Sequence, residues 1–228
     1  MDIIVPVKRF SEAKTRLAGP LRPAERATLA RLVVSTVLEQ LARVRRIRRV
    51  ILASSEPSLE QMAARFGFEM LMDDPQSPGL NAAVDRAVTQ SVASGAGDVG
   101  VVFSDLPLFN AKEFESILDV HFGGAPFQVT IVLDHFGTGI NVRLCRPGDL
   151  LTSLYGRNSA IEHQRAAALR GAEIRAVDSD CFSHDLDQLA DIQVVLNLAG
   201  QHAVSPTLRA MFRKWVNQDI RRGQSKCA

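Results

Sequence analysis

Short apolar runs alternate with stretches of helical periodicity along the first half of the sequence, and this alternation limits the possible folds more than any other feature. The runs at 3–7, 50–54, 68–72 and 99–103 read as buried strands. The helices expected between and after them begin at Pro23, span 56–66 and 80–94, and include Phe114, Ile117 and Leu118. Such alternation predicts an α/β fold, in which helices cover both faces of a mostly parallel sheet.

The pattern changes in the second half of the chain. Strand-like runs at 127–133 and 140–145 flank a glycine-rich turn, which suggests a hairpin or another antiparallel addition to the sheet. A helix over 158–169, a strand over 174–177 and a helix over 189–198 follow. No low-complexity linker or repeat interrupts the chain, so we expect one domain over residues 1–200. Residues 201–228 are expected to form a C-terminal helical extension, which serves as a packing arm or as the contact of a homodimer.

Bulk properties exclude several classes of protein. The formal net charge of the 228 residues is +2, which gives no reason to expect a nucleic-acid or membrane partner. The run of arginines between Arg43 and Arg49 reads as a solvated helix end rather than as a polyanion site. The three cysteines lack metal-ligand spacing, no apolar run approaches a membrane span, and no signal peptide is evident. We therefore expect a cytoplasmic protein.

Two acidic segments far apart in the sequence predict a metal site. Asp105 lies one residue beyond the apolar run 99–103, where the carboxyl ends of strands in open α/β sheets border ligand sites. Its alternative role is to cap the next helix. If the segment 183–187 is extended, Asp185 and Asp187 project to the same side. Three convergent carboxylates would bind a hard cation such as Mg²⁺ better than any one of them.

A basic loop follows the first strand and carries Lys8, Lys14 and Arg16. Cations beside a metal-binding acid suit a polyphosphate ligand, whereas alone they would read as a solvated loop. Other nucleotide motifs are missing or misplaced. The GxGxxG match at 95–100 follows a helix and precedes a strand, the reverse of the dinucleotide-binding context, and the sequence has no P-loop.

Seven segments, taken in order, resemble the CofC/FbiD family, the guanylyltransferases of coenzyme F420 biosynthesis. They are VPVK at 5–8, AKTRL at 13–17, PGLNAA at 78–83, DLP at 105–107, GTGIN at 137–141, GRNS at 156–159 and DLD at 185–187. Each segment alone is a weak signal, but their shared order over residues 1–198 is specific.

This resemblance implies a nucleotide-diphospho-sugar-transferase-like (Rossmann-like) fold and a reaction. GMP would pass from GTP to a small phosphorylated acid, namely 2-phospho-L-lactate, phosphoenolpyruvate or 3-phosphoglycerate, with Mg²⁺ as cofactor. The resemblance assigns nucleotide binding to Lys8, Lys14, Gly79, Asn81 and Asp105, and catalysis to Lys14, Arg16 and Asp105. It assigns the metal to Asp105, Asp185 and Asp187, and the acceptor to Ile140, Asn141, Gly156 and Ser159.

Two departures from the family pattern fall on the acceptor side. Ile140 stands where the family has threonine, and Arg157 adds a cation to the acceptor loop. They bear on the identity of the acceptor more than on the reaction. The alternatives are a related nucleotidyltransferase that uses CTP or another acceptor, and a non-catalytic nucleotide-binding module.

Overall fold

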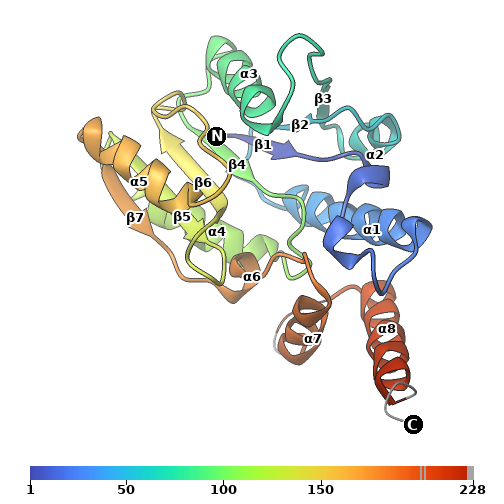
Figure 1. The fold of residues 1–228 in the computed structure, drawn as a ribbon. Helices are drawn as coiled ribbons and strands as arrows, with labels where there is room; N and C mark the ends of the chain where they lie inside the picture. The colour runs from blue at the N-terminus through green and yellow to red at the C-terminus, as the bar shows by residue number, and fades with distance from the viewer. Residues whose placement is uncertain (201, 203, 225–228) are drawn as a thin grey trace.

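A seven-stranded sheet forms the centre of the protein. The computed structural model describes residues 1–200, 202 and 204–224, with side chains as far as Asn217. The sheet has the strand order β3-β2-β1-β4-β6-β5-β7 (Figure 1). The strands are β1 (Asp2–Pro6), β2 (Arg49–Ala53), β3 (Glu69–Leu71), β4 (Val99–Val102), β5 (Gln128–Leu133), β6 (Ile140–Arg146) and β7 (Glu173–Ala176).

The predicted mostly parallel sheet with an antiparallel addition is confirmed. β6 runs antiparallel to both β4 and β5, while the other neighbouring pairs are parallel. From β1 the chain builds outward through β2 and β3, then returns to place β4 on the other side of β1. The order therefore reverses between β1 and β4, which is the place where open α/β sheets form their ligand crevice.

Helices cover both faces of this sheet. One face packs against α1 (Pro23–Leu41), α2 (Leu59–Phe66), α4 (Ala111–Phe122) and the short α6 (Asp180–Ser183), and the other against α3 (Leu80–Ala93) and α5 (Ser159–Leu169). The apolar spacing of α1 explains its position, because Val34, Val37 and Leu38 are buried against the sheet. Each aliphatic side chain buried in this way contributes roughly 1.5–3 kcal/mol.

A third apolar cluster joins the C-terminal helices to the rest of the protein. α7 (Leu189–Leu198) and α8 (Pro206–Gln224) lie below the sheet in Figure 1. Phe212 and Trp215 of α8 are buried with Leu29 and Val33 of α1. The expected C-terminal helix is thus present, while residues 201, 203 and 225–228 of the extension lie outside the described residues. No described helix combines the length and the apolar character that a membrane crossing requires.

Some predicted boundaries were wrong for local reasons. α2 begins at Leu59 rather than at Glu56, because the Glu56 carboxylate accepts hydrogen bonds from the amides of Ser58 (3.1 Å) and Phe10 (2.9 Å). These bonds hold residues 56–58 in a turn. α6 and the 3₁₀ helices η1 (Phe10–Glu12) and η2 (Thr15–Leu17) were not predicted, since three or four residues are too few to show periodicity.

The arginine run is less solvated than the sequence suggested. Arg48 and Arg49 place Nη2 atoms 2.8 and 2.9 Å from Oδ2 of Asp2, whose side chain is fully buried. Both guanidinium groups therefore compensate a buried carboxylate at the start of β1. This use of the two cations also argues against a polyanion site. Residues 95–98 of the GxGxxG segment lie in the loop between α3 and β4, and Val99 and Gly100 begin β4, so the segment follows a helix and precedes a strand, as expected.

Candidate active site

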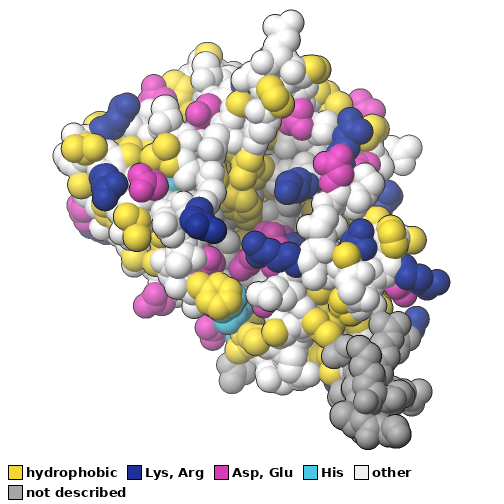
Figure 2. Space-filling model, in the orientation of Figure 1, with side chains coloured by type: hydrophobic (Ala, Val, Ile, Leu, Met, Phe, Trp, Pro, Cys, Tyr) yellow, Lys and Arg dark blue, Asp and Glu magenta, His cyan; other side chains and the backbone are white. Residues whose placement is uncertain are grey.

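A pocket of about 540 Å³ opens where the strand order reverses. Its lining comes from the loop after β1, the start of α3 and the segment after β4. Figure 2 shows the hollow in the middle of this face, with apolar side chains on its floor and basic and acidic side chains together at its lower rim. Six of the predicted site residues line it: Lys8, Lys14, Arg16, Gly79, Asp105 and Asp187.

Three carboxylates from the two acidic segments converge beside this pocket. Oxygens of Asp105, Asp185 and Asp187 lie within 4.8 Å of one another. The amide of Leu186 donates to the carbonyl of Asp105 (3.0 Å), and the Leu186 side chain is fully buried. The leucine between the two acids thus anchors the segment. The alternative cap role for Asp105 is excluded, because Asn110 caps α4 by accepting from the Glu113 amide (3.1 Å).

The acidic segment is held at both ends by side chains. On its N-terminal side, the Asn141 amide nitrogen donates to the carbonyls of Phe182 (2.9 Å) and Ser183 (3.3 Å). On its C-terminal side, Oδ2 of Asp191 accepts from the amides of Asp187 (2.7 Å) and Gln188 (2.6 Å). Asn141, which was predicted to contact the acceptor, therefore positions the two acids through the backbone. Its predicted acceptor contact stays a prediction.

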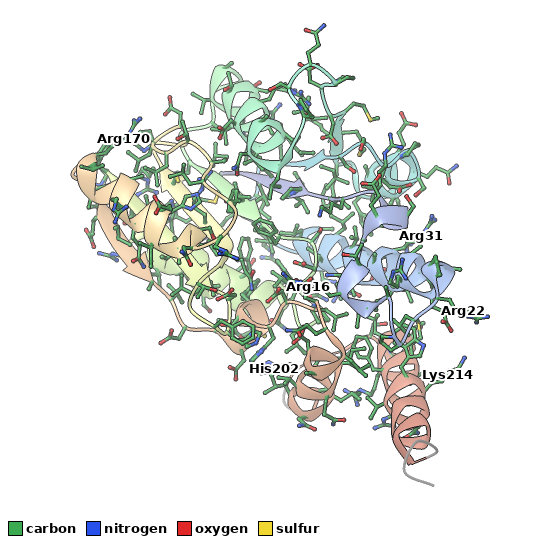
Figure 3. The ribbon with its side chains drawn as sticks, viewed as in Figure 1. Arg16, Arg22, Arg31, Arg170, His202 and Lys214 are labelled. Atoms are coloured by element: carbon green, nitrogen blue, oxygen red, sulfur yellow. The ribbon has the colours of Figure 1, made fainter. Side chains whose placement is uncertain are left out.

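Two cations face the carboxylates. Nζ of Lys14 lies 3.1 Å from Asp105 and 3.4 Å from Asp187, and Nη1 of Arg16 lies 2.8 Å from Asp187. Figure 3 shows Arg16 reaching toward the centre of the molecule. The Lys14 side chain is only 7% exposed, whereas that of Arg16 is 70% exposed. Burial disfavours the Lys14 ammonium, but Asp105 and Asp187 outweigh it and raise the pKa of Lys14. Lys14 thus remains charged at neutral pH.

The backbone at Lys14 is in the left-handed region, with φ of 56°. A non-glycine residue rarely adopts this conformation, and the cost is of order 1–3 kcal/mol. The ion pairs with Asp105 and Asp187 help to offset it. Strain held by contacts of this kind is common at functional sites.

The three carboxylates are a suitable donor set for a divalent cation. Burial, followed by the neighbouring charges of Asp105 and Asp187, raises the pKa of Asp185 to about 6. Lys14 only partly offsets this repulsion, since its effect on Asp185 is smaller than that of either acid. Carboxylate oxygens are the ligands that Mg²⁺ prefers, usually together with substrate phosphates. A hard divalent cation would neutralise the charge that the acids share.

The two predicted acceptor segments lie side by side. The amide of Ala160, at the start of α5, donates to the carbonyl of Thr138 (3.1 Å). Gly156 has φ of 148°, a value that favours glycine. The side chain of Ile140 is buried in the core, so only its backbone could reach a ligand. Ser159 is also buried.

Asn81 has a role that the sequence did not indicate. Its side-chain amide donates to the Tyr155 carbonyl (3.1 Å) and accepts from the Tyr155 amide (2.9 Å). It thus ties α3 to Tyr155, which directly precedes the predicted acceptor segment 156–159, and its predicted nucleotide contact stays a prediction.

A buried cation beneath the acceptor loop was missed by sequence reasoning. Arg143 is 1% exposed, and its guanidinium lies 5.2 Å from the centre of the Tyr155 ring. Among the described residues, Arg143 Nε and Tyr155 Oη have no hydrogen-bond partner. The only available signal was an arginine inside the apolar run 140–145.

His163, on α5, is part of the same buried layer. Its Nε2 accepts from the Leu154 amide (3.2 Å), so its Nδ1 must donate to the Ser159 carbonyl (2.8 Å). Burial and the charge of Arg143 lower the pKa of His163 to about 4. The neutral imidazole therefore holds the backbone at Leu154 and Ser159, on either side of the predicted acceptor segment's loop, rather than transferring protons.

Comparisons with known proteins agree with this geometry. A family model described as guanylyl transferase CofC like matches residues 1–213. A phosphoenolpyruvate guanylyltransferase of Sphaerobacter thermophilus is 32% identical over 202 residues, which cover 88% of this chain and 93% of the relative. A 2-phospho-L-lactate guanylyltransferase of Methanothermobacter thermautotrophicus is 30% identical over 201 residues, which cover 88% and 86%.

Solved structures support the predicted fold class. A crystal structure described as a nucleotide-diphospho-sugar transferase of Desulfovibrio desulfuricans superposes with a TM-score of 0.75 at 17% identity, covering 95% of this chain and 96% of that one. A CMP:2-keto-3-deoxy-manno-octonic acid synthetase gives a TM-score of 0.58 at 16% identity, covering 87% and 98%. At these identities the likeness shows a shared fold alone.

Proposed function

Because the chain belongs to the CofC-like family of guanylyl transferases, we propose that it transfers GMP from GTP to a small phosphorylated acid and releases pyrophosphate. The relatives named above suggest phosphoenolpyruvate and 2-phospho-L-lactate as acceptors, and 3-phosphoglycerate is a third candidate. On the resemblance described earlier, the product would serve coenzyme F420 biosynthesis.

One observation carries this proposal. Three carboxylates and two cations, drawn from three separate parts of the chain, meet at the rim of a pocket at the switch point of the sheet. Neither the carboxylates alone nor the cations alone make a suitable site for a nucleoside triphosphate. Together they supply a cation site and positive charge for the same phosphates.

The reaction we propose needs no general base. The second pKa of a phosphate ester is about 6, so the acceptor phosphate is mostly a dianion at neutral pH. One of its oxygens forms a bond to the α-phosphorus of GTP, and the bond to the bridging oxygen of pyrophosphate breaks. A neutral, buried His163 is consistent with a site that moves no proton.

The residues of the chain would align two anions that repel each other. Lys14 and Arg16 would bind the triphosphate, and Asp105, Asp185 and Asp187 would hold Mg²⁺. When bound, the metal supplies charge neutralisation at the reacting phosphates. The segments 137–141 and 156–159 would bind the acceptor, with Gly156 and the backbone of Ile140 as contacts.

The test is a matrix of reactions. The protein is incubated with Mg²⁺, one of GTP, CTP, ATP or UTP, and one of the three acceptors. Pyrophosphate release is measured and the product is identified by mass. We expect a guanosine product linked by a phosphoanhydride, and loss of turnover in Asp105→Asn with the fold retained. A cytidine product would favour a CTP-dependent relative, and no turnover with any pair would favour a non-catalytic module.

A further inference from the structure

A second cluster of possible metal ligands lies outside the pocket, on the side of the sheet that packs against α4 and α6. The Cys181 Sγ is 3.2 Å from Oε2 of Glu113 and 3.1 Å from Nδ1 of His202. Glu113 lies in the first turn of α4, Cys181 in α6, and His202 between α7 and α8. Figure 3 shows His202 close to α6 and α7. One ligand atom from each residue lies within 4.8 Å of the other two.

The surroundings of Cys181 differ from those of an ordinary buried cysteine. A free cysteine in a core usually behaves as a small apolar side chain. Cys145 has such a place, in the apolar layer beneath α3 and α5. Cys181 is equally buried, but a carboxylate and an imidazole both contact its sulfur. Packing alone does not explain why two polar groups converge on a fully buried thiol.

The donor set indicates which metal would bind. Zinc takes thiolate, imidazole and carboxylate ligands together, often from three side chains with water in the fourth position. Mg²⁺ prefers oxygen ligands alone, as offered by Asp105, Asp185 and Asp187. The other carboxylate oxygen of Glu113 accepts a hydrogen bond from the Ser179 hydroxyl. Hydrogen bonds from neighbouring groups to a ligating side chain orient it toward the metal.

We propose that Glu113, Cys181 and His202 form a zinc site separate from the catalytic acids. Without metal, the Cys181 thiol keeps its proton and donates a hydrogen bond to the Glu113 carboxylate. Zinc binds the thiolate, so the thiol proton passes to solvent when the metal enters. The bound ion would link His202, which follows α7, to Glu113 of α4 and Cys181 of α6. Because only His184 separates the end of α6 from Asp185, the site would also help to hold the catalytic acids in position.

The test uses the full-length chain without an affinity tag. Purified protein is loaded with zinc and dialysed, and its metal content is measured. Co²⁺ is then substituted, because a cobalt–thiolate bond gives a charge-transfer band in the near ultraviolet that carboxylate ligands do not give. Cys181→Ala and His202→Ala remove one ligand each. Cys145→Ala removes an equally buried cysteine, and Asp105→Asn alters the carboxylate site; both serve as controls.

We expect one zinc ion per chain and the cobalt–thiolate band in the unaltered protein and in both controls. Cys181→Ala and His202→Ala should lose both the bound zinc and the cobalt–thiolate band. Zinc should raise the unfolding temperature only of the unaltered protein and the two controls, in which all three ligands are present. His202 is only partly buried, so its variant tests the site even if Cys181→Ala does not fold. The proposal is overturned if the unaltered protein retains no zinc, if the cobalt–thiolate band is absent, or if His202→Ala binds zinc as well as the controls do. None of these results depends on guanylyl transfer.

Discussion

Replacing Asp185 by asparagine should stabilise the metal-free protein while it abolishes the proposed reaction. Burial and the charges of Asp105 and Asp187 raise the pKa of Asp185 from 3.8 to about 6, and its side chain is 23% exposed. A difference of roughly two pKa units corresponds to about 3 kcal/mol. The folded chain binds the proton more tightly than the unfolded chain, so stability falls as pH rises through this window. Above pH 6, where Asp185 is ionised in the folded chain, the full destabilisation is present.

Asparagine has nearly the same shape as aspartate without the charge, so Asp185→Asn should raise the free energy of unfolding by up to about 3 kcal/mol at pH 7.5. For a chain of this length, a gain of about 3 kcal/mol corresponds to an increase of roughly 6–12 °C in the unfolding midpoint. Urea and thermal unfolding in EDTA measure it. Mg²⁺ should stabilise the unaltered protein and have little effect on the variant, because Mg²⁺ offsets the same repulsion.

Asp105→Asn is the matched control, and the opposite sign is expected. Asp105 lies 3.1 Å from the buried Lys14 ammonium, so its loss leaves a cation less compensated and should cost roughly 1–3 kcal/mol. At pH 4 the gain from Asp185→Asn should nearly vanish, since the folded unaltered protein is then protonated at this site. The reasoning is refuted if Asp185→Asn destabilises the metal-free protein, or if its gain is the same at both pH values.

Three further changes test other parts of the site. His163→Gln should remove a pH dependence of stability. Because the pKa of His163 is lowered to about 4, the free energy of unfolding of the unaltered protein falls by up to about 3 kcal/mol as pH falls from 6.5 to 4. Urea midpoints measured across this range test it, and the same pH dependence in the variant and the unaltered protein would contradict it. Gly79→Ala places a side chain at φ of 108°, at a cost of roughly 1–3 kcal/mol, and should raise the KM for GTP more than that for the acceptor. Arg16→Ala should change the free energy of unfolding by less than about 1 kcal/mol, because the Arg16 side chain is 70% exposed. The same variant should lower kcat at least about tenfold, and an unchanged kcat would contradict the proposed role of Arg16 in phosphate binding.

The meeting of the acids was predictable from the sequence because it depends on local rules. Asp105 directly follows the short stretch after a buried strand, and the ends of parallel strands lie at one edge of the sheet. Asp185 and Asp187 flank a leucine, and the burial of Leu186 directs both acids to the opposite side. The sheet followed in the same way from alternating apolar and helical segments.

Other features depend on contacts that no local pattern encodes. Cys181 meets Glu113 across 68 positions of sequence, and neither residue has a spacing that suggests the other. Asn81 and Asn141 stood in motifs associated with ligands, but whether a side-chain amide meets a ligand or the backbone is settled by tertiary packing. Arg143 read as part of an apolar strand, since the loop residues that cover it come later in the chain.

The hydrogen bond between the Leu186 amide and the Asp105 carbonyl has a consequence for biosynthesis. Asp105 is translated long before Asp185 and Asp187, and β5, β6 and β7 are translated in between. A nascent or prematurely terminated polypeptide that ends before residue 185 therefore lacks two of the three acids. On the proposed function, such fragments would not consume GTP, and nucleotide turnover would begin only after most of the protein has been translated.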